Sequence, residues 1–304
     1  MIEINNVSKS FDDIKAIHEI SLTIKEGQVF GLVGTNGAGK STLLRMMAGV
    51  LKQDAGSISI DGEAVFDNPK AKQNLVFIAD DQFFFLNDSA RMMADYYRNV
   101  YEHFDQDRFL KLLGEFGLDE KRKIRNYSKG MKRQLALLLG ICANTKYLFC
   151  DESFDGLDPV MRQSVKSLFA SDMVERGLTP VIASHNLREL EDICDHVGLL
   201  HKGGVLLSED LENLKLGIQR IQVVFRDGKE KEDAERIAQK FKVLDHSATG
   251  KVESFTLRGE EQNINAFMRE LEPKYYEPLP LTLEEIFIAE TESAGYDIRK
   301  LILG

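Results

Sequence analysis

The sequence predicts an α/β fold that carries a smaller α+β domain at its C-terminal end. Up to about residue 211, short apolar runs alternate with helical stretches, which is the pattern of parallel strands joined by crossover helices. A glycine-rich segment at residues 34–41 separates one of these runs from a helix. After residue 212, strand-like alternation followed by helical periodicity occurs twice. We therefore expect one domain at 1–211, with a helical subdomain at about 83–143, and a second domain at 212–304.

The elements of the first domain follow from its apolar runs and turn residues. Buried strands are expected where apolar residues run together between polar stretches, and turns where Asp-Gly or Gly-Gly interrupts such a run. The predicted strands are 29–33, 75–78, 147–150, 180–183 and 197–201; the predicted turns are 61–62 and 203–204; helices are expected at 41–49 and across most of 88–143.

The second domain reads as a small split βαβ unit, because each strand pattern is followed by a helical one. The expected strands pass through residues 221–225 and flank a turn at Thr249 and Gly250. Apolar residues at helical spacing predict helices over 234–241 and 264–271. A last helix is expected at 283–290.

Composition limits the classes of protein to which the chain can belong. The net charge of −10 argues against a protein that binds nucleic acid through phosphate contacts. No apolar run approaches the roughly 18–20 residues needed to cross a bilayer, and we expect no signal peptide. If the protein acts at a membrane, another chain must supply the spans. Cys142, Cys150 and Cys194 lack the spacing of metal ligands; Cys142 and Cys150 lie in apolar runs and are expected to be buried thiols in a reducing cytosol.

The glycine-rich segment reads GTNGAGKS and has the form G-x-x-x-x-G-K-[ST] of a phosphate-binding loop. Its glycines let several backbone N–H groups point at one anion, and the following helix adds the positive end of its dipole. Lys40 is expected to pair with the β- and γ-phosphates, and the Ser41 hydroxyl to hold Mg²⁺. The nucleotide-binding residues predicted here are Gly34, Thr35, Asn36, Gly37, Ala38, Gly39, Lys40, Ser41 and Thr42.

Two carboxylates and a histidine follow two of the predicted strands. Asp151 and Glu152 come directly after the strand at 147–150, which delivers them to the sheet edge where ligands bind in α/β proteins. Asp151 fits a Mg²⁺ ligand, and Glu152 fits a base that polarises the attacking water. His185 follows the strand at 180–183 and is expected within reach of a γ-phosphate.

A second helix start suited to an anion lies at residues 127–131, YSKGM. Ser128 is a natural cap, and Gly130 allows close approach to the backbone. One nucleotide does not need two such helix starts. A head-to-tail dimer, in which this segment closes over the ATP of the other subunit, explains both; an ordinary helix start is the alternative.

With these motifs in this order, residues 1–210 resemble the nucleotide-binding subunit of ATP-binding-cassette transporters. The matching residues are Phe11 (adenine platform), GTNGAGKST at 34–42 (Walker A), YSKGM at 127–131 with Ser128, Gly130 and Met131 (signature), YLFCDE at 147–152 (Walker B), Gly156-Leu157-Asp158-Pro159 (D-loop) and His185 (H-loop). The resemblance implies a P-loop ATPase core with a mixed sheet and a helical subdomain, binding ATP and Mg²⁺.

The resemblance also implies the partners and the place of action. They are a second copy or a second ATPase subunit, with Ser128, Gly130, Met131 and Asp158 completing the nucleotide site, and a separate membrane permease at the cytoplasmic face of the membrane. The C-terminal domain resembles appendages of bacterial exporter-type subunits, which favours export of a peptide, an antibiotic or another amphipathic substrate.

The chain departs from the family pattern at three places. Its signature segment reads Ser128-Lys129-Gly130-Met131, where the family usually has an LSGGQ-like sequence. Ser153 and Phe154 replace the usual Pro-Thr after the Walker B glutamate. Asp80 occupies the position of the family's Q-loop glutamine, with Gln82 two residues later as the alternative. Asp80 can ligate Mg²⁺ through a hard oxygen, and its negative charge would slow hydrolysis.

Three aromatic residues, Phe83, Phe84 and Phe85, follow this position. Neighbouring side chains point apart in a strand or a helix, so at least one of them is expected to be exposed. In the family, this segment borders the groove that receives a coupling helix of the membrane subunit. A core-facing cluster is the alternative.

Three functions therefore compete. The first is a transport ATPase that drives an export partner; the second is a soluble cassette ATPase in assembly or repair; the third is a nucleotide-binding module without ATPase activity, which Asp80 keeps open. A single cassette and the lack of a long coiled-coil pattern favour the first.

Overall fold

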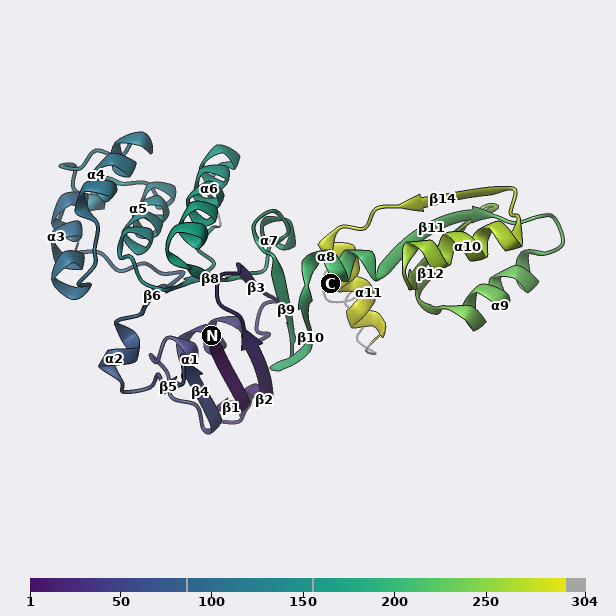
Figure 1. Cartoon of the computed structure of the whole chain (residues 1–304), viewed down its shortest axis with the longest axis horizontal. Helices are drawn as coiled ribbons and strands as arrows, with labels where there is room; N and C mark the ends of the chain where they lie inside the picture. Colours follow the sequence, from purple (N-terminus) through teal and green to yellow (C-terminus); the bar gives the residue numbers. More distant parts are fainter. Residues whose placement is uncertain (86, 155, 294–304) are drawn as a thin grey trace. The chain divides into compact units, whose positions relative to one another are not determined.

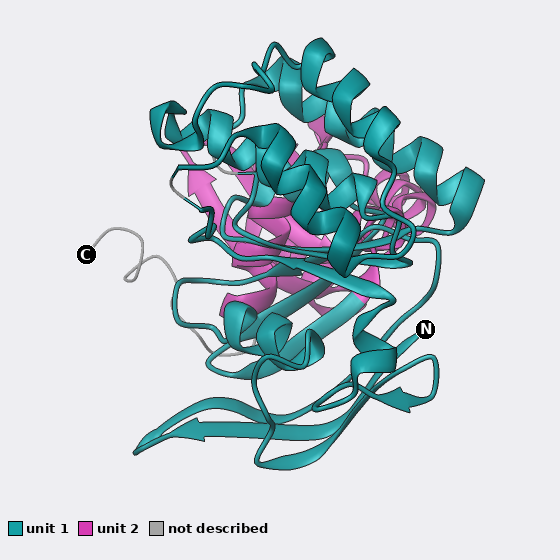
Figure 2. Cartoon of the chain, turned by 90° about the vertical axis from the view of Figure 1, so that its left-hand side faces the viewer, with its two compact units in different colours: residues 1–208 teal, residues 209–304 magenta. Residues whose placement is uncertain are grey.

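The computed structural model describes residues 1–85, 87–154 and 156–293. The chain divides into two compact units, residues 1–208 and residues 209–304, which are coloured separately in Figure 2. The division lies slightly before the boundary predicted from the sequence, because the strand β10 (Gly204–Asp210) runs through it.

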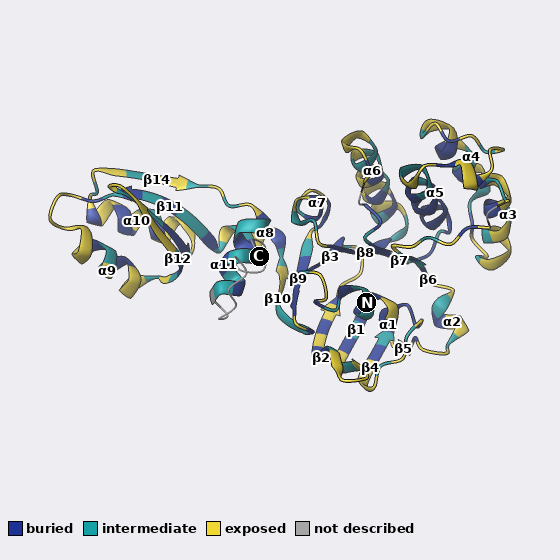
Figure 3. Ribbon diagram, turned by 180° about the vertical axis from the view of Figure 1, so that it is seen from behind, coloured by how far each residue is buried: buried dark blue, intermediate teal, exposed yellow. Residues whose placement is uncertain are grey.

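A six-stranded sheet forms the centre of the first unit. Its order is β10-β9-β3-β8-β7-β6, and the neighbours from β9 to β6 are parallel. The remaining bounds are β3 Phe30–Val33, β6 Leu75–Ile78, β7 Tyr147–Asp151, β8 Thr179–Ser184 and β9 His196–His201. Strands β3, β7 and β8 are buried along their whole length (Figure 3). Because these three strands are adjacent and parallel, the loops that follow them meet at one edge.

A second, antiparallel sheet of order β2-β1-β4-β5 packs with helix α1 (Lys40–Met47) on one side of the central sheet (Figure 1). Its strands are β1 Ile2–Phe11, β2 Ile14–Ile24, β4 Ala55–Ile60 and β5 Glu63–Ala64. Asp61 and Gly62 join β4 to β5 at positive φ of 50° and 81°, the tight turn expected from the Asp-Gly pair. One hydrophobic core joins α1 to both sheets.

Helices cover the other side of the central sheet (Figure 1). They are α3 Ala90–Val100, α4 Gln106–Glu115, α5 Lys129–Cys142, α6 Pro159–Arg176 and α7 Leu187–Ile193, with the 3₁₀ turn Ile124–Asn126 before α5. The short α2 Pro69–Lys72 precedes β6 and lies on the side of the antiparallel sheet (Figure 1). Side chains at the expected positions cap α3, α4 and α5, namely Ser89, Asp105 and Ser128. Helices α3 to α5 form the helical part of this unit.

The second unit has the predicted strand–helix–strand repeat. Its sheet has the order β12-β13-β11-β14, with α9 connecting the first two strands in sequence and α10 the last two. The bounds are α8 Leu211–Leu216, β11 Ile218–Val224, α9 Glu230–Lys240, β12 Lys242–Thr249, β13 Val252–Arg258, α10 Glu261–Leu271, β14 Tyr275–Leu279 and α11 Leu283–Ser293. Apolar residues of β11, β13, α9 and α10 share one core. This arrangement is the split βαβ unit that the sequence predicts.

The fold class is confirmed, and so is the burial of the cysteines. All three thiols are free and buried, and burial raises the pKa of Cys142 to about 12. None of the described helices combines the length and apolar character that a membrane span requires.

Candidate nucleotide-binding site

The phosphate-binding loop connects β3 to α1 and depends on glycine at two positions. Gly39 has a φ of 102°, and a Cβ there would lie 2.6 Å from Ile17 Cδ1 and 2.7 Å from the Ala16 carbonyl oxygen. A Cβ on Gly34 would lie 2.5 Å from the carbonyl oxygen of Leu200. Only glycine fits this close packing of the loop against neighbouring backbone.

Lys40 is buried beneath this loop, with 5% of its surface exposed. Its Nζ donates hydrogen bonds to the carbonyl oxygens of Gly34, at 2.7 Å, and Thr35, at 3.3 Å, and lies 3.8 Å from Glu152 Oε1. Burial lowers the pKa of Lys40, while the charges of Glu152 and Asp151 oppose this shift. The ammonium group is thus held inside the loop, at the place where the sequence predicts a phosphate contact.

Ser41 and Asp151 form the candidate metal site. Ser41 Oγ donates a hydrogen bond of 2.8 Å to Asp151 Oδ1, while Asp151 Oδ2 is buried without a hydrogen-bond partner among the described residues. Burial raises the pKa of Asp151, and the hydrogen bond from Ser41 counteracts it. A hydroxyl and a carboxylate oxygen fit Mg²⁺, which takes few protein ligands and fills its shell with water and phosphate oxygens. No cluster of three or more His, Cys, Asp or Glu residues that could hold a metal ion occurs in the described part of the chain.

Glu152 and His185 are brought together by the adjacent strands β7 and β8. Glu152 has a φ of 49°, a left-handed conformation that is strained for a side chain of this kind, and its N–H donates to the Ala183 carbonyl oxygen at 2.9 Å. Its Oε2 lies 2.8 Å from Nδ1 of His185. The two residues expected to act on the attacking water and the γ-phosphate are therefore hydrogen-bonded to each other.

Asp80, one of the two candidates for the Q-loop residue, forms an ion pair that the sequence does not predict. Asp80 Oδ1 lies 3.0 Å from Nη2 of Arg133, and the Asp80 side chain is 56% exposed. Gln82 Nε2 is buried without a hydrogen-bond partner among the described residues. The choice between Asp80 and Gln82 as the Q-loop residue stays a prediction. In the sequence, Arg133 looks like one of several solvated bases at the start of a helix; only its place on the apolar side of that helix pointed to burial.

The signature segment and the D-loop begin two helices. Ser128 Oγ accepts a hydrogen bond from the Met131 N–H at 3.2 Å at the start of α5, and Asp158 caps α6 by accepting from the Met161 N–H at 2.9 Å. The two segments approach each other, since a Cβ on Gly130 would lie 3.7 Å from the Gly156 carbonyl oxygen. The start of α5 has a neutral hydroxyl cap and fits a contact to an anion, whereas the Asp158 carboxylate already occupies the start of α6. The contact of either segment with ATP stays a prediction.

Phe11, the expected adenine platform, ends β1 and is 45% exposed. The β1–β2 hairpin places it close to the loop, because Phe11 pairs with Ile14 and the nearby Ala16 packs against Gly39. An exposed ring beside a phosphate-binding loop is suited to stacking on a base.

Comparison with known proteins identifies the family. A family model described as ABC transporter matches residues 17–155. YtrB, an ABC transporter ATP-binding protein of Bacillus subtilis (strain 168), is 33% identical over 290 residues, covering 95% of this chain and 98% of YtrB. The chain belongs to the ATP-binding-cassette (ABC) transporter family. It is an ATP-binding subunit of this family whose reaction is ATP hydrolysis, which argues against a module without ATPase activity.

Other ABC proteins match about 70% of the chain. The bacitracin transport ATP-binding protein BcrA of Bacillus licheniformis is 30% identical over 219 residues, covering 71% of each chain. The ATP-binding subunit of an ABC transporter superposes with a TM-score of 0.66 at 22% identity, covering 71% of this chain and 92% of that one. A dimeric ATP-binding cassette with bound ADP and Pi superposes with a TM-score of 0.63 at 22% identity, covering 69% of this chain and 99% of that one. At this identity the structures establish the fold alone.

An exposed apolar surface follows the Q-loop position of this ABC cassette. Phe83 is 80% exposed and Phe85 42%, whereas Phe84 is buried, so the expected alternation is confirmed and the core-cluster alternative holds for Phe84 alone. The Phe83 and Phe85 rings pack edge to face, with 5.6 Å between the ring centroids. Phe85 packs in the same way on Tyr96 of α3, with 5.5 Å between the centroids. Met92 and Val100 of α3 are also exposed. We call Phe83, Phe85, Met92, Tyr96 and Val100 the aromatic surface.

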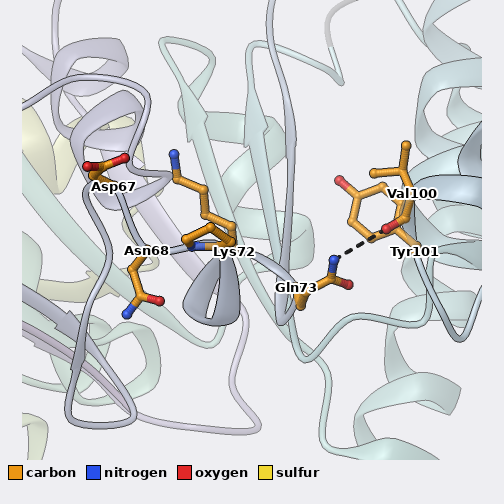
Figure 4. Close-up of a pocket in the computed structure, with 7 residues that line it drawn as sticks. Asp67, Asn68, Lys72, Gln73, Val100 and Tyr101 are labelled. Atoms are coloured by element: carbon orange, nitrogen blue, oxygen red, sulfur yellow. Dashed lines mark hydrogen bonds between the residues drawn. The ribbon is translucent and has the colours of Figure 1, made fainter.

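A pocket of about 290 Å³ lies at the Val100 end of this surface (Figure 4). It is formed between the start of α2 and the end of α3, where Gln73 Nε2 donates to the Val100 carbonyl oxygen at 3.5 Å. Asp67 and Lys72 give it charged walls, and Tyr101 an aromatic one. A hollow beside exposed apolar residues is a common feature of protein docking sites.

Proposed function

We propose that this chain dimerises head-to-tail around two ATP molecules and drives a separate membrane-spanning partner that exports a peptide, an antibiotic or another amphipathic substrate. The observation that carries the proposal is the cluster of Lys40, Ser41, Asp151, Glu152 and His185 at one sheet edge. Relatives named for bacitracin and lantibiotic transport favour the substrate class.

Each residue of the cluster would have a separate role in phosphoryl transfer. Mg²⁺, held by Ser41 and Asp151, would neutralise charge on the β- and γ-phosphates. Lys40 would exchange the carbonyl oxygens of its loop for phosphate oxygens, and Glu152 would orient the attacking water in line. His185, at 2.8 Å from Glu152, would contact the γ-phosphate. Such catalysis is positioning and electrostatic stabilisation, with no covalent step on the protein.

The dimer would complete each nucleotide site with the signature segment of the second chain. Ser128, Gly130 and Met131 offer a helix start to the phosphates, with Asp158 in the adjoining D-loop, and Phe11 offers a ring to the adenine. A second ATPase subunit with the same segment would serve as well as a second copy. Hydrolysis cleaves the γ-phosphate, and its release as inorganic phosphate removes negative charge that bridges the two chains, which would open the dimer.

The aromatic surface and its pocket would receive a helix of the membrane partner, placing this chain at the cytoplasmic face of the membrane. Exposed aromatic residues beside a pocket are the anchors expected of a protein interface. Phe83 follows Asp80 by three positions, and this short segment would connect the surface to the nucleotide site.

Purification from detergent-solubilised membranes of the host tests the proposal. The wild-type chain should retain a multi-spanning protein in a fixed ratio, whereas Phe83→Ser with Phe85→Ser should lose it and still hydrolyse ATP. Val174→Ser, which changes an 88% exposed valine of α6, is the matched control. A wild-type chain that binds soluble proteins alone would favour the assembly or repair ATPase instead.

A further inference from the structure

Arg133 is a buried cation in the first half of α5, five positions after the cap Ser128. Its side chain is 6% exposed, although the neighbouring Lys129 is exposed. Burying a guanidinium is unfavourable unless an anion compensates its charge. One such anion is Asp80, from a segment 53 positions earlier, with Oδ1 at 3.0 Å from Nη2.

Asp80 belongs to the electrostatic environment of the nucleotide site. It follows β6 at the same sheet edge as Asp151, because β6 and β7 are parallel neighbours in which Ile78 pairs with Cys150. Asp80, Asp151 and Glu152 therefore place three carboxylates at the site before the phosphates of ATP bind. An uncompensated Asp80 would repel these phosphates, because charges act over several ångströms in a partly buried site.

Arg133 also reaches the D-loop. A Cβ on Gly156 would lie 3.5 Å from Nη1 of Arg133, and the same glycine's carbonyl oxygen faces Gly130. The guanidinium thus lies where three segments meet: the end of β6, the start of α5 and the loop after β7. Each of these segments adjoins a residue expected to contact nucleotide.

We propose that Arg133 is a positioning residue for ATP binding, which compensates the charge of Asp80 and fixes this carboxylate at the edge of the site. The inference rests on the proposed nucleotide site and is independent of the membrane partner. Under the prediction that Asp80 is the Q-loop residue, the ion pair with Arg133 explains how an acid is accommodated at that position.

The test is a double-mutant cycle on the full chain, with binding of the non-hydrolysable analogue AMP-PNP as the readout. Arg133→Gln should weaken binding by about tenfold, and more strongly in EDTA than with Mg²⁺, because the metal-free nucleotide carries more negative charge. Asp80→Asn combined with Arg133→Gln should restore the affinity to about that of the wild-type chain. Arg133→Lys, which keeps the charge, should bind nearly as the wild type does.

Two results would overturn the inference. One is wild-type affinity in Arg133→Gln; the other is a double variant as weak as Arg133→Gln, which would show that Arg133 matters for packing alone. Asp80→Asn gives an independent readout if Arg133→Gln does not fold, since it should bind metal-free AMP-PNP more tightly than the wild type; weaker binding would contradict the charge argument. If the wild-type chain itself fails to bind AMP-PNP, the proposed nucleotide site fails, and this inference with it.

Discussion

Single residues of the nucleotide site are held in environments that disfavour their charged forms. Burial lowers the pKa of Lys40 and raises that of Asp151, so both shifts act against ionisation. The opposite charges of Lys40 and Asp151 partly compensate each other in the folded protein. Bound ATP and metal would complete this charge compensation. Such a site decreases the stability of the nucleotide-free protein in exchange for affinity.

Asp151→Asn should therefore stabilise the nucleotide-free protein at neutral pH. The pKa of Asp151 is raised above its ordinary 3.8, so its contribution to stability is fully present below that value and is lost as the pH rises through the raised pKa. Asp151→Asn removes the ionisable group, so the variant does not lose this stability as the pH rises. Its melting temperature should exceed that of the wild type by about 2–4 °C per kcal/mol of desolvation removed, with the difference growing as the pH increases. Thermal unfolding in EDTA across this pH range measures it.

Asp61→Asn is the matched control, because its pH dependence has the opposite sign. Although burial raises the pKa of Asp61, hydrogen bonds from the terminal amino group, Lys146 and Tyr147 bring it down to about 2. This group contributes stability above its ordinary 3.8, which is lost as the pH falls towards 2. Its variant should melt below the wild type at neutral pH. Equal melting temperatures of Asp151→Asn and wild type at neutral pH would contradict the desolvation argument.

Glu152→Gln should reduce kcat for ATP hydrolysis by about 10²–10⁴-fold, because the amide cannot accept a proton from water. Its KM for ATP should change little, since Glu152 contacts His185 and Lys40 and is not expected to hold the phosphates directly. Glu115→Gln, an exposed site on α4, serves as the control. Steady-state phosphate release measures both constants, and a kcat within twofold of the wild type would remove Glu152 from its proposed role.

Between elements, a buried ion network joins α4 to α6. Asp172 of α6 is fully buried and accepts from Arg108 of α4 at 2.7 Å and from Arg176 at 2.8 Å. Arg176 also donates to the carbonyl oxygens of Thr145 and Ile141. The helical part of the first unit is thereby fixed to the helix that follows the D-loop, so a movement of one is expected to displace the other.

Asp172→Ala should destabilise the protein by about 3 kcal/mol, because two guanidinium groups would lose their buried anion. The expected decrease in melting temperature is about 6–12 °C. Glu175→Ala, on the exposed face of the same helix, should change it by no more than about 2 °C. Thermal unfolding of the two variants tests this prediction. If both variants lower the melting temperature by a similarly small amount, Arg108 and Arg176 find other partners or become hydrated.

The sequence predicts those elements whose signals are local. The strand at 75–78 is bounded as expected, and the loop at 34–41 lies between a strand and a helix because its motif is contiguous. The pair of Asp80 and Arg133 could not be anticipated, since its two charges are 53 positions apart and each alone resembles a solvated residue. The boundary near residue 211 was displaced because β10 continues without interruption past the end of the first unit.

For the whole molecule, the proposed dimer requires that each nucleotide site draws residues from two chains. Lys40 and Ser128 of one chain would then belong to different sites. Lys40→Ala and Ser128→Arg should each be inactive alone, the first through loss of phosphate binding and the second through a bulky side chain at the start of α5. A mixed dimer would keep one intact site, built from the loop of the second variant and the signature segment of the first. An equal mixture should therefore show about a quarter of the wild-type ATPase rate. The control is a mixture of two differently tagged Lys40→Ala chains, which should stay inactive. If mixed dimers of the two variants are isolated and their ATPase rate does not rise, the head-to-tail arrangement is refuted.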